Sequence, residues 1–283
     1  MLEMDLQQLR PRLMSVAYRM LGSVMDAEDA VQDAFLRLQS AENVVSPEGF
    51  LVKATTRRCI DQLRAQRRRE TYVGPWVPEP VETRQSIPVD ALAESLTQAF
   101  LLMLERLSPT ERAAFLLRTV FAYDYSEIAE ILGKTDAHIR QIVSRARLHI
   151  EQNRPRFHSS PQQAHELAER FLAACRTGDA RQVERLFTDD AEVHSDGGGK
   201  VAAARVVISG RSRAARFLAG VFSKKHRASE LHLTNVNGEP GVMCTSQGEV
   251  VLVASLHIEE KVRAVYLTNN PDKLARWSQA TIE

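Results

Sequence analysis

Residues 124–150, DYSEIAEILGKTDAHIRQIVSRARLHI, predict two helices joined by a tight turn. Ala129 is small enough for the second helix to approach the first, Gly133 suits the turn, and Ile139 is a β-branched residue that can fill the space between them. Asp124 and Glu127 have the spacing of an N-terminal capping pair for the first helix. The stretch is therefore predicted to fold as a helix-turn-helix.

The second predicted helix has one apolar face and one polar face, and Thr135 or Asp136 can cap its N-terminus. Arg and Gln are side chains that pair bidentately with guanine and adenine in the major groove of DNA. A solvated amphipathic hairpin would show the same pattern, so the surrounding sequence has to decide between these two interpretations. One apolar stripe collects Ile128 and Leu132 of the first helix and Ile139, Ile142, Val143 and Ala146 of the second, and the polar face of the second helix collects His138, Arg140, Gln141, Ser144, Arg145 and Arg147.

The composition is typical of a soluble globular protein. The 283 residues are enough for two or three domains, and 44% of them are hydrophobic and 26% charged. No apolar run is long enough to span a bilayer, and the N-terminal residues MLEMDLQQLR lack the pattern of a signal peptide. Cys59, Cys175 and Cys244 are far apart and form neither a disulfide framework nor a zinc-binding pattern. We therefore expect a protein of the reducing cytoplasm, with no membrane segment, metal or cofactor.

The net charge of +1 hides charges that are strongly segregated along the chain. Residues 53–70 hold seven basic and two acidic residues, and residues 134–156 hold six basic and two acidic residues. Residues 26–33 hold four acidic residues and no basic one. The basic patches favour a polyanionic partner, and the acidic patch favours a protein partner.

Helical patterns dominate the first half of the chain. One helix ends near Gly22, with Pro11 in or before its first turn; a second covers residues 27–41, and Ser46-Pro47 begins a third. Residues 71–89 carry four of the eleven prolines, which predicts an extended linker. Trp76 has no use in a bare spacer, so this part of the linker is expected to dock on another part of the protein.

The helical pattern resumes at Asp90, and Ser108-Pro109 begins a further helix before the helix-turn-helix. After Pro161 the pattern changes: residues 162–177 and 179–187 predict helices, and residues 215–222 predict one more between strands. Helices followed by a mostly antiparallel, curved sheet predict an α+β domain, with Asn237-Gly238 as a hairpin turn. The runs predicted as strands are residues 191–196, 201–209, 228–238, 240–246, 248–260 and 262–270.

The first half of the chain resembles a bacterial sigma factor of the extracytoplasmic-function type, in the sigma-70 family. The resemblance rests on AEDAVQDAFLRL at 27–38, PEGFLVKATTRRCIDQLRAQRRR at 47–69 and residues 107–147, which include the helix-turn-helix. The second half resembles a SnoaL-like domain of the NTF2-like superfamily. Sigma factors with this extension, the sigma J type, carry three marker motifs, which stand here as Trp76–Pro80, Asp196–Lys200 and Asn270–Leu274.

This resemblance implies a multidomain fold of two all-α sigma domains and an α+β domain with a cone-shaped sheet. Residues 1–72 would be sigma region 2, which binds polymerase and recognises and melts the −10 element. Residues 73–95 would be the proline-rich linker with its WVPEP motif. Residues 96–153 would be the region 4 helix-turn-helix that recognises the −35 element, and residues 162–283 would be the SnoaL-like regulatory domain.

The resemblance also implies two partners, core RNA polymerase, through its β′ clamp helices and β flap, and promoter DNA. Three surfaces would bind them: one for polymerase, one for the −10 element and one for the −35 element. Solvated charged faces are the plain alternative, since cations also favour a helix C-terminus. Arg and Lys would hold phosphates, and the helix-turn-helix would read bases. The expected polymerase-binding residues are Asp26, Glu28, Asp29, Gln32, Asp33 and Phe35; the expected −10 residues are Lys53, Arg57, Arg58, Asp61, Arg64, Arg67 and Arg68; and the expected −35 residues are Lys134, His138, Arg140, Gln141, Ser144, Arg145 and Arg147.

The C-terminal domain admits two interpretations. Some SnoaL-like domains are cyclases or isomerases, and His194 with Asp196 could form an acid–base pair, with His257 or Tyr266 facing a cavity. Such a pair with no further constellation is a weak catalytic pattern, and glycines 197–199 favour a tight loop whose backbone amides are free to meet a partner.

We therefore expect no enzyme activity, but a domain that contacts the sigma core and tunes transcription in cis. A ligand-responsive helix-turn-helix repressor is a further alternative, and an unidentified small ligand could modulate the domain. The residues expected to form the regulatory contact are Trp76, Pro78, Glu79, Pro80, Asp196, Gly197, Gly198, Gly199, Lys200, Asn270, Pro271, Asp272, Lys273 and Leu274.

Overall fold

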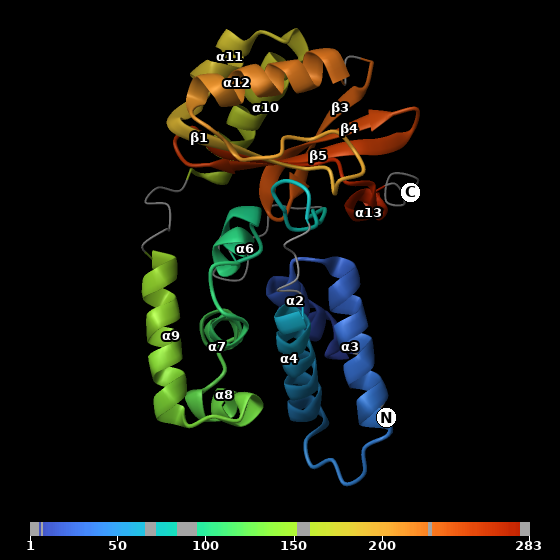
Figure 1. Ribbon diagram of the computed structural model, residues 1–283, viewed down its shortest axis with the longest axis vertical. Helices are drawn as coiled ribbons and strands as arrows, with labels where there is room; N and C mark the ends of the chain where they lie inside the picture. Colours follow the sequence, from blue (N-terminus) through green and yellow to red (C-terminus); the bar gives the residue numbers. More distant parts are fainter. Residues whose placement is uncertain are drawn as a thin grey trace. The chain divides into compact units, whose positions relative to one another are not determined.

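The computed structural model describes residues 6, 8–65, 72–83, 95–151, 159–225 and 228–277. The chain divides into two compact units, residues 1–70 with 100–154 and residues 71–99 with 155–283 (Figure 1). The first unit is helical and the second contains a six-stranded sheet, so the predicted fold class of helical sigma domains followed by an α+β domain is confirmed. The segment predicted as a linker belongs to the same unit as the sheet.

Among the described residues, three helices form the first part of the helical unit: α2 (Arg10–Leu21), α3 (Val24–Gln39) and α4 (Pro47–Ala65). Pro11 lies in the first turn of α2, as predicted, where its missing N–H costs no helical hydrogen bond. Gly22 ends this helix in the left-handed conformation, with a φ of 67°. The next helix begins at once, because the Ser23 side chain accepts a hydrogen bond from the Asp26 amide.

The second part, as far as its residues are described, consists of four helices: α6 (Gln98–Leu104), α7 (Pro109–Thr119), α8 (Tyr125–Leu132) and α9 (Asp136–Glu151). The Glu127 carboxylate accepts a hydrogen bond from the Asp124 amide (2.7 Å), and Gly133 ends α8 with a φ of 64°. The predicted helix-turn-helix is therefore confirmed. The helix predicted from Asp90 begins later, because residues 95–97 form a turn; residues 90–94 lie outside the described residues.

Buried side chains hold the helical unit together. Ala129 and Ile139 are buried between α8 and α9, in the steric arrangement that the sequence predicts. Arg112 on α7 is only 3% exposed, and its guanidinium donates to the Met20 carbonyl at the end of α2 (2.6 Å). Glu105 pairs with the same guanidinium at 2.9 Å, so the buried charge is neutralised.

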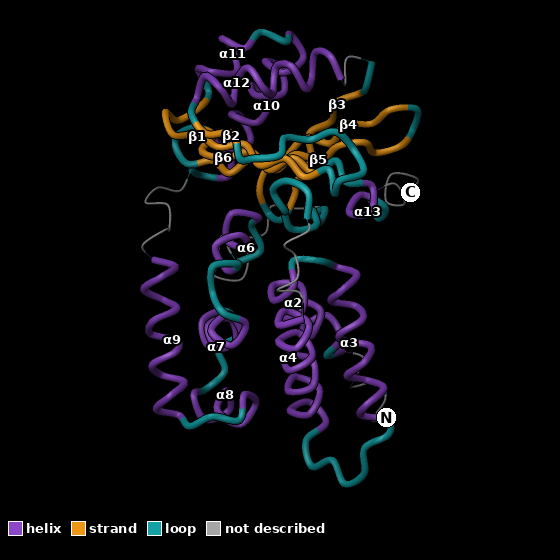
Figure 2. Tube along the Cα trace, viewed as in Figure 1, coloured by secondary structure: helices purple, strands orange, loops and turns teal. Residues whose placement is uncertain are grey.

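The sheet of the second unit has the strand order β2-β1-β6-β5-β4-β3 (Figure 2). Strands β3 to β6 form an antiparallel meander, but β1 runs parallel to β6, so the sheet is mixed where a mostly antiparallel one was predicted. The strands are β1 (Phe187–Asp196), β2 (Ile208–Ser209), β3 (Glu230–Val236), β4 (Glu239–Ser246), β5 (Glu249–Ile258) and β6 (Val262–Thr268).

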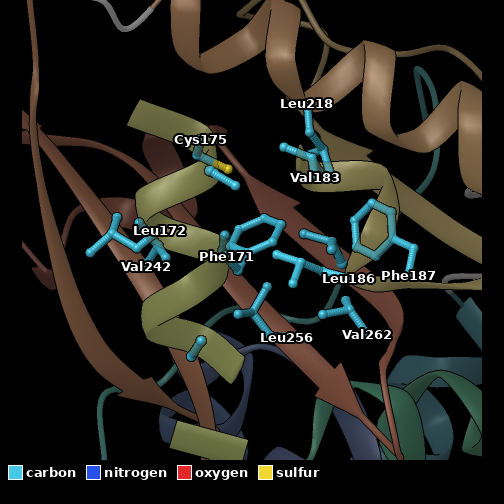
Figure 3. Packing of buried hydrophobic residues seen from close by; sticks show 14 of the residues in the cluster. Phe171, Leu172, Cys175, Val183, Leu186, Phe187, Leu218, Val242, Leu256 and Val262 are labelled. Atoms are coloured by element: carbon cyan, nitrogen blue, oxygen red, sulfur yellow. The ribbon is translucent and has the colours of Figure 1, made fainter. Parts of the chain in front are cut away.

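Helices α10 (Pro161–Thr177), α11 (Ala180–Arg185) and α12 (Arg211–Gly220) accompany this sheet, and α12 continues into a short π-helix, Val221–Lys225. Phe171 on α10 packs among Phe187, Leu256 and other apolar side chains of the strands (Figure 3). Only Ile208–Ser209 of the strand predicted at 201–209 forms, because residues 201–207 are a loop in which Val206 is 70% exposed. Among the described residues, no helix is long and apolar enough to cross a membrane.

Candidate nucleic-acid interface and linker site

Helix α9 presents the predicted −35 residues to solvent. Ile139, Ile142, Val143, Ala146 and Ile150 form its buried face. The Thr135 hydroxyl accepts a hydrogen bond from the His138 amide (3.3 Å), so Thr135 supplies a cap and Asp136 lies in the first turn. The seven residues predicted to contact the −35 element are all exposed: Lys134, His138, Arg140, Gln141, Ser144, Arg145 and Arg147.

Two of the arginines on α9 have an aromatic or acidic neighbour. The Arg140 guanidinium stacks over the Tyr125 ring at 4.2 Å, which directs it toward the start of α8. Arg145 lies close enough to Glu111 to help lower the pKa of that carboxyl, whose main cause is the hydrogen bond from the Ser108 side chain. Gln141 and Ser144 lie between them on the exposed face.

The basic helix α4 contacts α8 within the same unit. The Arg57 guanidinium donates to the Ile131 carbonyl (3.0 Å), and the Lys53 ammonium lies 3.6 Å from the Glu130 carboxylate. Both cations, which were predicted to meet −10 DNA, therefore engage the first helix of the helix-turn-helix in this conformation.

Three further predicted −10 residues, Arg58, Asp61 and Arg64, lie on the same helix. Arg58 lies 3.9 Å from Asp33, one of the predicted polymerase-binding residues, and Asp61 pairs with Arg64 at 3.6 Å. Arg67 and Arg68 lie outside the described residues.

The acidic helix α3 exposes more than its predicted polar residues. Asp29 and Gln32 are exposed, and Asp26, Glu28, Asp33 and Phe35 are partly exposed. Met25 and Leu36 are 62% and 58% exposed, although both are large apolar side chains. Residues 25, 29, 32 and 36 share one face by helical spacing. Sequence reasoning missed this apolar component, which the same spacing could have indicated.

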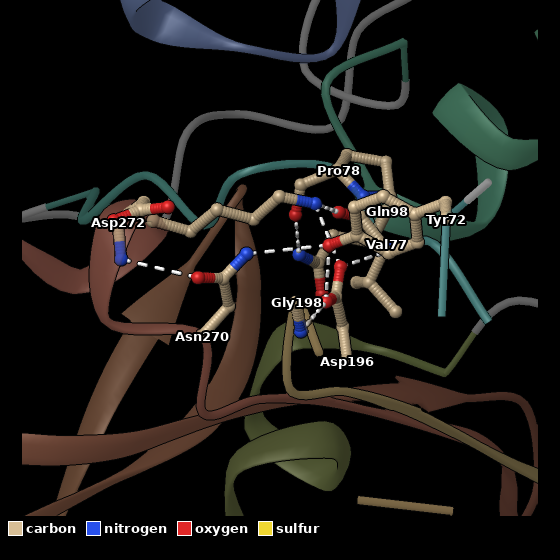
Figure 4. Close-up of polar contacts among 9 residues, drawn as sticks. Tyr72, Val77, Pro78, Gln98, Asp196, Gly198, Asn270 and Asp272 are labelled. Atoms are coloured by element: carbon tan, nitrogen blue, oxygen red, sulfur yellow. Dashed lines mark hydrogen bonds and ion pairs between the residues drawn. The ribbon is translucent and has the colours of Figure 1, made fainter. Parts of the chain in front are cut away.

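A buried carboxylate organises the linker site. Asp196, at the end of β1, has a fully buried side chain and four hydrogen-bond donors around it (Figure 4). Two donors come from the linker: the Tyr72 hydroxyl (2.5 Å) and the Val77 amide (3.0 Å). The other two are the Gly198 amide (2.9 Å) and the Lys273 ammonium (2.7 Å). These four donors replace the hydrogen bonds to water that the carboxylate loses on burial.

Lys273 joins this carboxylate to the aromatic residues of the linker. Its ammonium lies 4.5 Å from the centre of the Trp76 ring and 5.5 Å from that of Tyr72, and it donates to the Val77 carbonyl. The side chain of Lys273 is 11% exposed, so these contacts replace most of its water. The docking expected of Trp76 is therefore observed, on the segment that begins with Asn270.

The rest of the WVPEP motif is buried, namely Val77, Pro78, Glu79 and Pro80. The Trp277 indole donates a hydrogen bond to the Pro80 carbonyl (2.9 Å). The Glu79 carboxylate is 3.9 Å from the Arg276 guanidinium. The sequence did not single out Trp277 or Arg276, because they follow the marker motif and form no pattern of their own.

Glycine is required in the loop that follows Asp196. A Cβ atom on Gly197 would lie 2.2 Å from the Val201 carbonyl oxygen, and one on Gly198 would lie 2.4 Å from Asn270 Nδ2. The expectation that these backbone amides are free for a partner is wrong for Gly198, whose amide donates to Asp196 within the loop. Lys200, the last residue of the motif, pairs with Asp272 at 2.7 Å at the surface.

The acid–base pair considered for His194 and Asp196 does not form. His194 contacts Glu192 (3.1 Å), because side chains two apart on a strand share a face and Asp196 is held by the linker. His194 stands beside Tyr266 with ring centres 5.1 Å apart, and His257 contacts Glu239 at 2.7 Å. Their neighbours along the strands, such as Val193, Val265 and Leu256, belong to the helix-covered core, so these polar residues lie on the other face of the sheet.

One recess of about 780 Å³ opens in the second unit between the end of α10 and the start of β3. Its lining includes Cys175, Arg176, Ser223 and His232. Burial raises the pKa of the Cys175 thiol, so this group stays protonated near neutral pH. Within the described residues, no group of His, Cys, Asp and Glu side chains has the arrangement of a metal site.

The chain matches two family signatures. The signature of Sigma-70 region 2 matches residues 6–69, and that of Sigma-70, region 4 matches residues 97–150. The ECF RNA polymerase sigma factor SigJ of Mycobacterium tuberculosis is 37% identical, over 95% of this chain and 92% of that protein. The probable ECF RNA polymerase sigma factor SigI of the same species is 30% identical, over 94% and 92%.

A solved structure matches this chain over nearly its whole length. The crystal structure of the Mycobacterium tuberculosis extracytoplasmic function sigma factor SigJ matches with a TM-score of 0.74 at 33% identity, and the match covers 96% of this chain and 97% of that one. The chain therefore belongs to the extracytoplasmic-function sigma factors of the sigma-70 family.

Proposed function

We propose that this chain directs core RNA polymerase to specific promoters in the cytoplasm, and that its C-terminal domain tunes this activity through the linker. The observation that carries the regulatory part is the buried Asp196 carboxylate, which binds the linker at Tyr72 and Val77 and the C-terminal segment at Lys273. A bare tether between two sigma domains would need no such site.

The promoter contacts follow from the exposed and basic surfaces. Arg140, Gln141, Ser144 and Arg145 on α9 would read base edges of the −35 element, while Lys134 and Arg147 would hold phosphates. His138 would contact DNA at the same surface. The −10 element would be bound by Lys53, Arg57, Arg58, Asp61, Arg64, Arg67 and Arg68.

The polymerase contact would use helix α3. The predicted residues are Asp26, Glu28, Asp29, Gln32, Asp33 and Phe35, and the exposed Met25 and Leu36 would add apolar area to the contact with the β′ clamp helices. The β flap would be a second contact of polymerase with the −35-reading domain.

The burial of the linker supports the proposed regulatory contact. The Tyr72 hydroxyl and the Val77 amide both donate to the Asp196 carboxylate. A hydrogen bond to a charged group contributes about 1.5–3 kcal/mol, so these two bonds can hold the linker against thermal opening. The contacts between α4 and α8 supply a reason for regulation, because Arg57 and Lys53 have to leave Ile131 and Glu130 before they can bind phosphates. The C-terminal domain would influence this exchange through the linker that joins the two helical parts.

We propose no enzyme activity for the C-terminal domain. The helix-covered face of its sheet is filled with apolar side chains, and His194 and His257 on the other face each pair with a glutamate, not with a nucleophile. An unidentified small ligand of the recess beside Cys175 could still modulate the domain.

Reconstitution with core RNA polymerase on a promoter library tests the proposal. The full chain should give specific run-off products, and a chain that lacks residues 162–283 should give altered amounts of them. Tight binding to duplex DNA without polymerase would instead indicate a repressor. If transcription and polymerase affinity are both unchanged by the truncation, the regulatory role is wrong.

A further inference from the structure

The turn between β3 and β4 has an unusual environment. Asn237 and Gly238 form a two-residue turn with φ values of 55° and 81°, which suits Asn and Gly. The turn between β4 and β5, Gln247-Gly248, has nearly the same φ values of 53° and 81° and is exposed. Asn237 is fully buried although it sits at the tip of a hairpin. A buried polar side chain needs hydrogen-bond partners, which the turn itself does not require.

The side-chain amide of Asn237 forms hydrogen bonds with two separate parts of the linker. Its Oδ1 accepts a hydrogen bond from the Val81 amide (2.9 Å), and its Nδ2 donates to the Leu96 carbonyl (2.9 Å). Its own backbone amide donates to the Val81 carbonyl (2.8 Å). One side chain therefore holds two linker positions that are 15 residues apart in the sequence.

Backbone pairing strengthens the contact on one side. Glu82 forms an antiparallel bridge with Val236, and the Thr83 amide donates to the Asn235 carbonyl (3.0 Å). The Gly238 amide donates to the Thr83 hydroxyl (3.0 Å). Because β3 is the outermost strand of the sheet, its unpaired edge can accept an added strand.

We propose that the tip of the β3–β4 hairpin, residues 235–238, is a second docking element for the linker, separate from the Asp196 site. Asn237 is its positioning residue, since it fixes both Val81, just after the WVPEP segment, and Leu96, just before α6. Gln98, the first residue of α6, extends the same arrangement by donating to the Pro78 carbonyl (2.9 Å). This inference rests on the proposed regulation through the linker and adds a contact outside its three marker motifs.

Asparagine is chemically suited to this position. Its amide offers both a donor and an acceptor, and it tolerates the left-handed backbone conformation. Aspartate would keep the acceptor for Val81 but turn a carboxylate oxygen toward the Leu96 carbonyl. Glycine would keep the backbone conformation and lose both side-chain hydrogen bonds.

Hydrogen exchange of the full chain tests the docking element. In Asn237→Gly, the Val81 amide should exchange roughly tenfold faster or more, because it loses its acceptor. The Thr83 amide should also exchange faster, because its segment is then held only by backbone pairing with the hairpin. The matched control is Gln247→Gly, which makes the same change at the exposed turn and should leave both amides as they are. Asn237→Asp separates the two bonds, because Val81 keeps its acceptor while the contact with Leu96 is lost.

Run-off transcription by the same variants links the docking element to activity. Asn237→Gly and Asn237→Asp should both change promoter-directed transcription by severalfold, and Gln247→Gly should not. Unchanged exchange at Val81 and Thr83 in Asn237→Gly would overturn the docking element, whatever happens at Asp196. Faster exchange with unchanged transcription in both the Asn237 variants and Asp196→Asn would instead overturn the proposed regulation.

Discussion

Replacing Asp196 with asparagine removes the charge at the centre of the linker site and keeps its shape. The carboxylate has four donors and is fully buried, and its partner Lys273 is 11% exposed. A hydrogen bond to a charged group contributes about 1.5–3 kcal/mol, and loss of a partner from a buried ion pair costs about 3–5 kcal/mol. We expect Asp196→Asn to weaken linker docking by about 3 kcal/mol.

Amide exchange at Val77 measures this loss directly, because its N–H donates to Asp196. A loss of about 3 kcal/mol corresponds to a roughly hundredfold faster exchange if the linker opens locally. The control is Asp272→Asn, which removes the same charge from the exposed pair with Lys200. Exposed pairs contribute about 0–1 kcal/mol, so this control should leave Val77 nearly unchanged.

Two results would refute the reasoning. Equal effects of Asp196→Asn and Asp272→Asn would mean that burial does not determine the strength of the site. Unchanged exchange at Val77 in Asp196→Asn would mean that the carboxylate does not hold the linker.

Three further predictions follow from the described contacts. Gly198→Ala should loosen the linker site, because its Cβ would lie 2.4 Å from Asn270 Nδ2. Gly248 has a similarly positive φ but no atom within 4 Å of an added Cβ, so Gly248→Ala should cost only about 1–2 kcal/mol of backbone strain. Calorimetry of both variants compares their free energies of unfolding. Burial lowers the pKa of His257, but the Glu239 carboxylate outweighs this effect and raises the pKa. The pair with Glu239 therefore stabilises the fold fully below the ordinary histidine pKa of about 6.5. This stabilisation is lost as pH rises through the higher pKa of the folded state. The free energy of unfolding should therefore fall over that range, and Glu239→Gln should flatten the slope; an unchanged slope would contradict this assignment. Arg145→Ala should weaken −35 binding by about 1–3 kcal/mol at one base position, and binding titrations across base substitutions would refute base reading if the loss is uniform.

Local signals in the sequence predicted the helical unit well. The capping residues Ser108 and Asp124 and the glycine at 133 act within one turn of their helices, so a single sequence reveals them. The polar and apolar faces of α9 follow from spacing alone. The three marker motifs, drawn from the family resemblance, meet at the linker site, but which side chain is buried there could not be predicted.

Long-range pairing explains what the sequence did not reveal. The parallel pairing of β1 with β6 joins residues such as His194 and Tyr266, and no local pattern encodes that choice. Residues 201–207 have an apolar strand-like composition but follow the glycine turn into a loop. Asn237 was recognised only as a turn residue, because its contacts with Val81 and Leu96 depend on the folded linker.

Run-off transcription with core RNA polymerase, at one promoter selected from the library, tests the central claim most directly. The full chain and its Asp196→Asn variant would be compared at equal concentration, with Asp272→Asn as the control for stability. We predict specific transcripts from the same start site in all three, with a severalfold different amount in Asp196→Asn alone. Absence of specific transcripts from the full chain, or equal amounts from all three proteins, would contradict a sigma factor tuned through its linker.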